Sequence, residues 1–467
     1  MATKKTQYLN LNLLFVLIGT LFYAKPINSQ NQDSVTIRKL YDYYLTQSKT
    51  YSNLEALCLK IGGRISGSQQ AANAVVWAKR AMYAAGADTV FLQPCMVPHW
   101  VRGAKEECYF VTKSNQMMSL NCIALGSSVG TGEKGVKAKV IEVNNFEELE
   151  KLGEKTIKGN IVFYNVFFDQ SKIRTGNAYG EAVKYRGKGA SMAAKFGAIA
   201  SVVRSMTSVA DDEAHTGNMG YDTSISKTKI PAIAISYKGA DLLHNALLSE
   251  KNIELFIQTN CQTLPDVLSY NVVGQITGKQ KPNEYIITGG HLDSWDNGQG
   301  AHDDGSGVVQ SIEILAAFKA LGIQPKHSIR AVAFMNEENG LAGGMAYAQW
   351  AKDHKEKHIA ALETDAGGYT PRGFGVDTAM GLYKQVLQWK PLFQAYFIDR
   401  IEQGGGGADI SALEKQGVPC IGFEPDTQRY FDIHHTAADT FDKINKRELN
   451  LGAAAIGALL YLIDSHN

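Results

Sequence analysis

From residue 269 to the end of the chain, short apolar segments alternate with helical patterns, and this alternation limits the possible folds more than any other feature. Five segments predict strands: NVVGQITG, YIITGG, IRAVAFM, AALETDA and PCIGFE. Between them, SGVVQSIEILAAFKAL and the GMAYAQWAKDH region predict helices. Strands that alternate with helices are typical of α/β domains with a mostly parallel sheet. We therefore expect an α/β fold whose mixed, mostly parallel sheet is flanked by helices.

The preceding part of the chain has a different organisation. Residues from about 33 to 90 predict helices that end in glycine, and TVFLQPCMVPHWVRG predicts a strand. Within 123–265, KGNIVFYNVFF and KIPAIAIS predict strands among loops rich in Gly, Ser, Thr and Lys. The 467 residues are too many for one ordinary core. We expect one domain formed by 33–122 and 266–467, interrupted by a compact inserted domain at 123–265, because exposed loops tolerate insertions.

The first 29 residues have the layout of a secretory signal peptide. Lys4 and Lys5 precede an apolar segment at 13–22, and small or polar residues follow near Ala24 and Ser29. The apolar segment is too short for a comfortable membrane span, although an uncleaved membrane anchor is the alternative. The pattern predicts export, either secretion or transfer to a periplasm, and no stable membrane span after processing.

Charge and cysteine content narrow the class of partner. The chain has 47 basic and 46 acidic side chains and a net charge of +1, which gives no reason to expect a nucleic acid or an anionic membrane as partner. Its six cysteines have neither CxxC pairing nor zinc-finger spacing. They could form disulfides in an exported protein or be small buried apolar residues.

Acidic residues and histidines recur where the predicted strands end. His291 and Asp293 follow YIITGG, Glu337 and Glu338 follow IRAVAFMN, and Asp365 ends AALETDA. In an open α/β sheet, ligands bind beyond the carboxyl ends of the strands. We therefore expect these side chains to meet in one crevice.

Two further groups belong to this pattern. Asp303 and Asp304 lie in the acidic loop before the helix that starts near Ser306, and His434 with His435 follows the strand that ends in FEPD. HxD, DDGSG and EE are each weak motifs, and only their joint placement at strand ends is informative.

This set of residue types predicts a metal site. So many carboxylates would repel one another by several kcal/mol unless a cation lay among them. Imidazoles with carboxylates and no thiolate suit zinc or a similar divalent ion. A carboxylate shared by two metals would form a two-metal hydrolytic site, and of two adjacent glutamates one could bind metal while the other acts as general base.

Several of these segments resemble the co-catalytic di-zinc aminopeptidase family of metallopeptidases: HLDSW, AHDDGSG, NEENGLAGG, ETDAG and HHTAADT. The resemblance extends through MVPHWVRG, KGNIVFYN and HTGNMGYD and so covers nearly the whole mature chain. It implies a zinc aminopeptidase fold of the phosphorylase-hydrolase type with a protease-associated domain inserted at 123–265.

The resemblance also implies roles for individual residues. His435 rather than His434 matches the family's ligand, because it directly precedes the threonine of the motif. Asp304 follows the bridging acid, where the family often has a cis peptide. Asp409 beside the glycine run Gly404–Gly407 and Tyr430 are weaker candidates for contacts with substrate, and His302 has no family role. The implied set is His291 and Asp365 on one zinc, Glu338 and His435 on a second, Asp303 bridging both, Glu337 as general base, and Asp293 orienting His291.

The function implied is that of an exported zinc exopeptidase that binds two Zn²⁺ per subunit, hydrolyses dipeptides or short peptides, and forms a homodimer. Carboxypeptidase, aminopeptidase and dipeptidase activities all remain open. One alternative is a general aminopeptidase for longer peptides. A one-zinc aminoacyl cyclase is disfavoured by the complete set of five ligands. An inactive, receptor-like binding protein is disfavoured for the same reason, because such proteins lose ligands.

Overall fold

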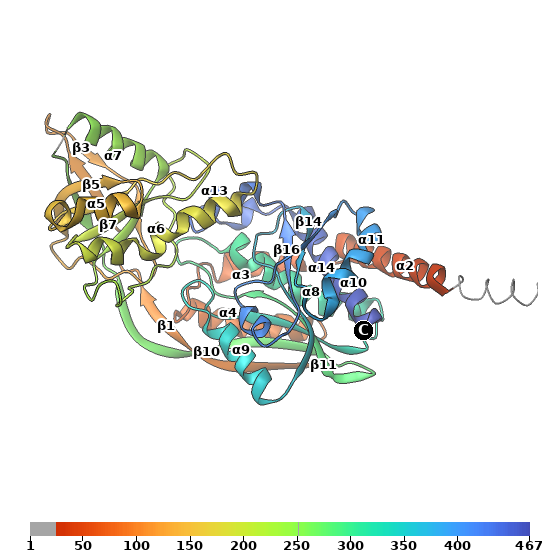
Figure 1. Ribbon diagram of the computed structural model, residues 1–467. Helices are drawn as coiled ribbons and strands as arrows, with labels where there is room; N and C mark the ends of the chain where they lie inside the picture. The colour runs from red at the N-terminus through yellow and green to blue at the C-terminus, as the bar shows by residue number, and fades with distance from the viewer. Residues whose placement is uncertain (1–24, 251) are drawn as a thin grey trace, which may run out of the picture.

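Two eight-stranded sheets organise the chain, and each belongs to a separate lobe (Figure 1). The computed structural model describes residues 25–250 and 252–467. The predicted signal peptide therefore lies outside the described residues, except for 25–29 at the start of helix α2 (Lys25–Thr46).

The larger sheet confirms the predicted mixed α/β fold. Each of the five strand segments predicted after residue 269 forms one of its strands. Its four central strands run parallel, while antiparallel neighbours lie on both sides of them. In spatial order the strands are β1 (Thr89–Val101), β10 (Gln262–Ile276), β12 (His327–Phe334), β11 (Lys281–His291), β13 (Lys357–Glu363), β16 (Cys420–Pro425), β14 (Pro371–Val376) and β15 (Arg400–Gln403).

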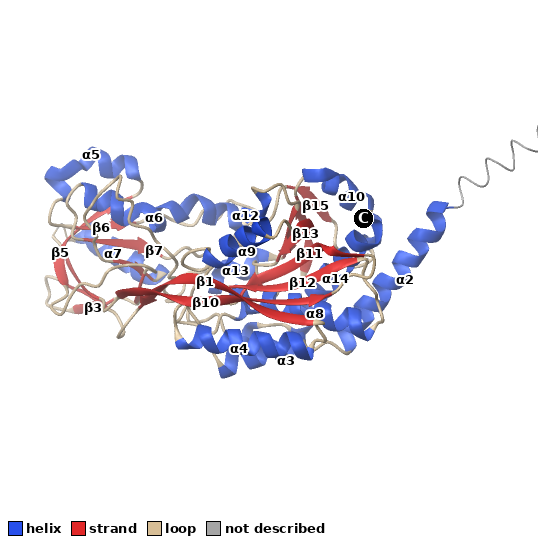
Figure 2. Ribbon diagram, turned by 90° about the horizontal axis from the view of Figure 1, so that it is seen from below, coloured by secondary structure: helices blue, strands red, loops and turns tan. Residues whose placement is uncertain are grey.

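Helices cover both faces of this sheet (Figure 2). On one face lie α3 (Thr50–Lys60), α4 (Gln69–Ala84), α8 (Ser306–Ala320) and α14 (Lys446–His466), with α2 packed against α14 and α8. On the other face lie α9 (Ala342–Asp353) and α12 (Ser411–Glu414). The short helices α10 (Leu382–Gln388) and α11 (Lys390–Gln394) precede β15, and α13 (Tyr430–Ile433) follows β16.

Neighbouring residues of the central strands belong to different cores. Val272 and Ile286 pack in the cluster beneath α8 and α14, whereas Val273 and Ile287 pack in the cluster beneath α9. Successive side chains of a strand point to opposite faces, so strands covered on both faces need continuous apolar runs. Among the described residues α14 is the one helix long and apolar enough to span a membrane, but 78% of its most apolar window is buried in this core.

The smaller sheet lies between β1 and β10 in the chain. Its order is β3 (Met117–Ser119), β2 (Glu107–Val111), β9 (Glu254–Gln258), β5 (Val136–Val143), β6 (Ile161–Tyr164), β7 (Ala200–Arg204), β8 (Ala232–Ile235) and β4 (Cys122–Ala124). Helices α5 (Phe146–Ile157), α6 (Thr175–Lys195) and α7 (Tyr237–Ser249) accompany it. This lobe has its own apolar clusters.

The smaller lobe starts earlier in the chain than the predicted insert at 123–265. Both β2 and β3 precede residue 123, in the segment assigned from the sequence to the other domain. These strands have only five and three residues and are partly exposed, and neither was predicted as a strand. All six cysteines carry free thiols in the structure, and five of them are buried.

Close packing joins the two lobes. Gly126 of the smaller lobe lies against the Trp295 ring, and a Cβ at that glycine would come within 1.9 Å of the indole. Arg102 donates to Asp296 at 2.6 Å, and its guanidinium also donates to the carbonyl of Ala124 at 2.7 Å. The smaller lobe therefore packs closely against the loop that follows β11 and carries Trp295. Any residue larger than glycine at position 126 would displace the indole.

Candidate metal centre

The ends of neighbouring parallel strands bring the first cluster together. His291 is the last residue of β11, and Asp365 follows β13 by two residues. His291 Nε2 lies 3.1 Å from Asp303 Oδ1 and 3.5 Å from Asp365 Oδ1. These three residues form a group with the spacing of a metal site. The sequence prediction that strand ends gather here is therefore supported by these distances.

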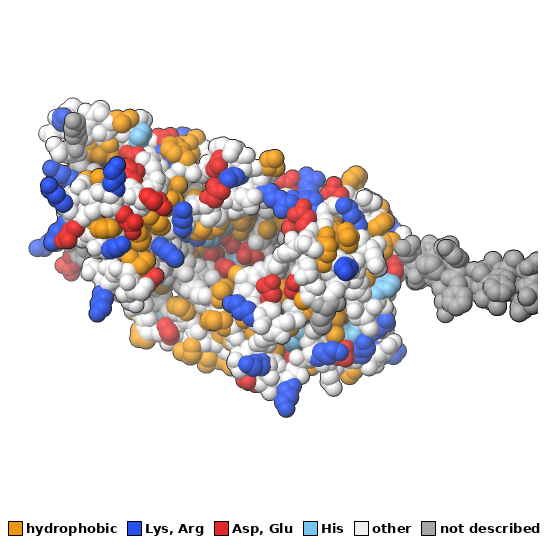
Figure 3. Space-filling view, viewed as in Figure 1, with side chains coloured by type: hydrophobic (Ala, Val, Ile, Leu, Met, Phe, Trp, Pro, Cys, Tyr) orange, Lys and Arg blue, Asp and Glu red, His pale blue; other side chains and the backbone are white. Residues whose placement is uncertain are grey.

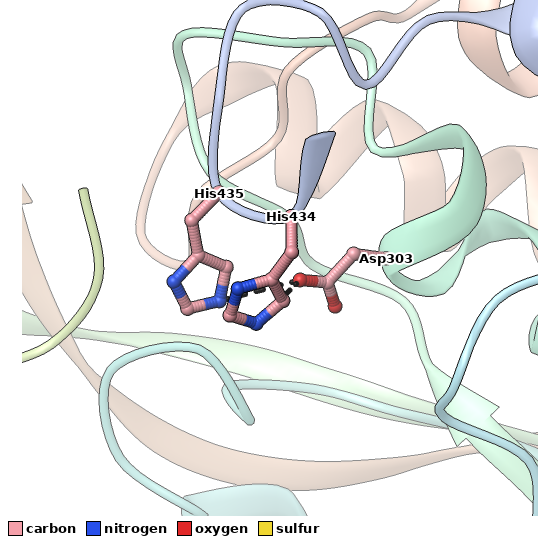
Figure 4. Close-up of side chains that lie close together, drawn as sticks. All are labelled: Asp303, His434 and His435. Carbon is pink, nitrogen blue, oxygen red and sulfur yellow. Dashed lines mark ion pairs between the residues drawn. The ribbon is translucent and has the colours of Figure 1, made fainter. Parts of the chain in front are cut away.

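A second cluster shares Asp303. His435 Nε2 lies 3.2 Å from Asp303 Oδ2 and 3.2 Å from Glu338 Oε2. His434, whose ring stacks on that of His435, has its Nε2 3.6 Å from the same Asp303 oxygen (Figure 4). Asp303 thus presents one oxygen to each cluster, and the structure brings both histidines of the pair to it.

The chemistry of these residues fits a divalent cation. Asp303 Oδ2 and Asp365 Oδ1 are buried and accept no hydrogen bond from any described residue. Buried polar atoms in folded proteins are normally paired, so two unpaired carboxylate oxygens facing imidazoles indicate a bound cation. Imidazole nitrogens and carboxylate oxygens without a thiolate are ligands of zinc.

Burial and mutual charge shift the pKa values of this cluster. Burial raises the pKa of Glu338 to about 7, and Asp303 acts in the same direction. Burial alone would lower the pKa of His435, but Glu338 and Asp303 outweigh it and raise the value to about 10. Burial, followed by the charges of Asp365 and Glu338, raises the pKa of Glu337 well above its ordinary value. The protein alone therefore holds protons that a bound cation would displace.

Asp293 acts mainly on the main chain. His291 Nδ1 pairs with the backbone carbonyl of Asp293 at 2.9 Å, whereas the nearest Asp293 carboxylate oxygen is 3.9 Å away. The carboxylate instead accepts hydrogen bonds from the amides of Asn336, Glu337 and Glu338 at 2.6, 3.1 and 3.3 Å. The sequence placed Asp293 beside His291, but the side chain fixes the turn that carries the two glutamates.

Other buried groups hold the acidic loop. Asp304, joined to Asp303 by a cis peptide as the resemblance implied, accepts from the amide of His291 at 3.1 Å. Asp439 accepts from the amide of Asp303 at 3.1 Å. The buried Arg64 donates to the carbonyls of Gln299 and Gly300 at 2.7 and 3.0 Å. Neither Asp439, which lies within HHTAADT, nor Arg64 was predicted as a site residue.

The two clusters open into a cavity of about 470 Å³ between the lobes, and acidic side chains line the hollow seen in Figure 3. The smaller lobe contributes three lining residues, Tyr179, Arg186 and Asn218, which the sequence analysis missed. The remaining lining residues are Asp303, Glu337, Glu338, Gly340, Leu341, Asp365, Tyr430, Phe431, His434 and His435. Tyr430, one of the two weaker candidates, is therefore at the cavity.

Asp409, the other weaker candidate, is not. Its side chain is 1% exposed and does not line the cavity. Its backbone packs against α9, since a Cβ on Gly344 would come within 2.3 Å of its carbonyl oxygen, and both of its carboxylate oxygens are buried without a hydrogen-bond partner among the described residues. His302 is also buried; it accepts from the amide of Gly368 at 3.1 Å and stacks on Tyr369, which agrees with its interpretation as a loop residue.

Comparisons with known proteins agree with this architecture. Residues 271–460 match Peptidase family M28. The chain is similar to Carboxypeptidase Q of Bos taurus, at 33% identity over 92% of this chain and 88% of that protein. The crystal structure of a Peptidase M28 precursor from Shewanella amazonensis SB2B matches with a TM-score of 0.87 and 30% identity, covering 93% of this chain and 97% of that one. A zinc aminopeptidase from Bacillus subtilis shares the fold, with a TM-score of 0.63 at 20% identity over 88% of this chain and 94% of that one. The chain therefore belongs to peptidase family M28, as a carboxypeptidase Q-like metallo-exopeptidase.

Proposed function

We propose that the chain is a zinc-dependent exopeptidase that holds two zinc ions and hydrolyses dipeptides or short peptides. The observation that carries this proposal is the position of Asp303, with one oxygen 3.1 Å from His291 and the other 3.2 Å from His435. A carboxylate between two imidazoles, each beside a further acid, suits a bridge between two cations. We assign Asp365 to the cation at His291, and Glu338 to the cation at His435.

Zinc bound there would act as a Lewis acid that polarises the scissile carbonyl of the peptide. Glu337 supplies the proton transfers. It lines the cavity without a pairing role in either cluster, and its raised pKa suits a group that takes a proton from the attacking water and gives it to the leaving amine. Asp293 holds Glu337 by its amide, and we assign Tyr430, which lines the cavity, as the donor to the oxyanion.

The proposed preference for short peptides rests on the cavity. Its volume of about 470 Å³ is in the lower half of the usual range for small-molecule sites. The smaller lobe supplies part of its wall, which limits the length of peptide that reaches the metals. We therefore propose that peptides of five or more residues are poor substrates.

Two measurements test the function. The zinc content of the purified protein should be two ions per chain; a metal-saturated protein with one ion would contradict the shared role of Asp303. The value of kcat/KM should be far higher for a dipeptide with free ends than for a hexapeptide that begins with the same residues. Comparable values would show an open site and favour the alternative, a general aminopeptidase.

Three further proposals concern the rest of the protein. The smaller lobe corresponds to a protease-associated domain, the mature protein is an exported homodimer, and residues up to about Ala24–Gln30 are removed as a signal peptide. N-terminal sequencing of material from the native host tests the cleavage, since an intact Met1 on membrane-bound protein favours the anchor. Light scattering tests the assembly, and a monomer at micromolar concentration would contradict the dimer.

A further inference from the structure

Arg186 of helix α6 is a buried cation that lacks an acidic partner. Its side chain is 7% exposed and lines the cavity, yet it makes no ion pair with any carboxylate of the described residues. Taking an unpaired charge out of water is unfavourable, so buried arginines normally face a carboxylate or another anion. The missing anion is therefore expected to come from outside the chain.

Neutral groups hold the guanidinium at the cavity wall. Nε donates to the carbonyl of Asn218 at 3.3 Å, Nη1 to the carbonyl of Thr216 at 3.3 Å, and Nη2 to the Tyr179 hydroxyl at 2.6 Å. Gly217 permits this approach, since a Cβ there would come within 2.3 Å of Arg186 Nη1. A guanidinium has five N–H donors; these bonds occupy three of them, and Nη1 also lies 3.4 Å from Nδ1 of His435. The group is fixed in place with donors to spare.

Its position relative to the metal centre suits the end of a short substrate. Nη1 of Arg186 lies 3.4 Å from Nδ1 of His435, while Nε2 of the same ring faces Asp303 and Glu338. The guanidinium is thus one imidazole ring away from the carboxylates that we assign to the metal. One residue of an extended peptide spans about 3.5 Å. A residue that follows the scissile bond would extend its carboxylate from the metals towards the guanidinium.

The charges around the cavity distinguish the two ends of a peptide. Among the lining residues, all of them described, Arg186 is the one lysine or arginine. Every lining acid is already assigned to the metals or to proton transfer: Asp303, Glu337, Glu338 and Asp365. A free substrate amine has no separate acid to pair with, whereas a free substrate carboxylate has Arg186.

We propose that Arg186 binds the free α-carboxylate at the C-terminus of the peptide, so that the smaller lobe selects substrates with an unblocked carboxyl end. This inference rests on the proposed function and identifies the residue of the same site that recognises the carboxyl end of the substrate. A guanidinium donates two parallel hydrogen bonds to a carboxylate, which makes the contact specific as well as strong. Such charged hydrogen bonds correspond to a change of about 10- to 100-fold in kcat/KM.

The test compares a dipeptide with its C-terminal amide, which has the same side chains and scissile bond, on the zinc-loaded protein. Wild type is expected to prefer the free acid by about 10- to 100-fold in kcat/KM. Arg186→Gln should reduce that ratio to near one. Lys188→Gln is the matched control, because it removes the same charge from an exposed position of the same helix and should leave the ratio unchanged.

The outcomes separate the possible roles of Arg186. If Arg186→Gln lowers activity on both substrates equally and keeps the ratio, the residue only supports the structure and the proposal is overturned. Should the glutamine variant not fold, Arg186→Lys keeps the charge but loses the paired donors, and an unchanged ratio in that variant would also overturn it. A wild-type enzyme that cleaves both substrates equally refutes this inference alone, whereas one that cleaves neither refutes the proposed function itself.

Discussion

Replacing Asp293 by asparagine should loosen the turn that carries Glu337 and Glu338. The carboxylate is fully buried and accepts three main-chain hydrogen bonds, two on Oδ1 from Asn336 and Glu337 and one on Oδ2 from Glu338. An asparagine keeps one acceptor oxygen but presents an amide group to the third N–H. Two donors would then face each other in a buried site.

The magnitude follows from these contacts. Loss of the bond to Glu338 removes about 1.5–3 kcal/mol, since its acceptor is charged. The two bonds to Oδ1 become neutral, and each weakens by about 1 kcal/mol. Burial raises the pKa of Asp293, so its charged form is itself disfavoured, and the neutral amide recovers part of the loss. We expect a net local destabilisation of about 2–4 kcal/mol.

Hydrogen–deuterium exchange, measured by mass spectrometry on the peptide around residues 336–338, reports this local destabilisation directly. Because 1.36 kcal/mol corresponds to a factor of ten, exchange of these amides should accelerate by about 30- to 1000-fold, and kcat should fall because Glu337 is no longer held. Asp266→Asn, at an exposed position of β10, should change neither. Unchanged exchange at 336–338 in Asp293→Asn would refute the claim that this carboxylate holds the turn.

Other substitutions probe separate parts of the molecule. Glu337→Gln keeps the shape of the side chain but removes its proton acceptor, so kcat should fall by at least about 100-fold with the zinc content unchanged. Normal turnover in this variant would mean that Glu337 is not the general base and would favour Glu338 in that role. Asp303→Ala should lose zinc and activity together, and retention of two zinc ions would exclude it as the bridge. Burial lowers the pKa of His358 to about 3, so as the pH falls the unfolded chain takes up a proton on this histidine before the folded chain does. The free energy of unfolding that the neutral His358 contributes is therefore complete above pH 6.5 and is lost as the pH falls towards 3. In His358→Gln the loss of unfolding free energy between pH 6.5 and 4 should be shallower by up to about 1.4 kcal/mol per pH unit, and an identical pH profile would contradict this sign.

The half of the site that stands on strand ends could be predicted from the sequence. The apolar runs of β11 and β13 are long enough to mark buried parallel strands, and His291 and Asp365 stand where those runs end. Parallel neighbours end at the same edge of a sheet, so the two side chains must approach each other. The short strands β2 and β3, of five and three residues, were not predicted, so the expected boundary at residue 123 lies later in the chain than the start of the smaller lobe.

The other half depends on loops and on contacts between the lobes, which no local pattern encodes. His435 has a left-handed backbone at φ 63°, and its carbonyl accepts from the amide of Thr216 at 3.0 Å. Its ring nitrogen Nδ1 lies 3.3 Å from the Thr216 carbonyl, 219 residues earlier in the chain, and 3.4 Å from Arg186. A non-glycine residue holds such a backbone conformation only when its surroundings impose it. The smaller lobe therefore does more than wall the cavity: it fixes the loop that carries one of the proposed ligands, so the second cluster depends on both lobes, whereas His291 is held by its own strand.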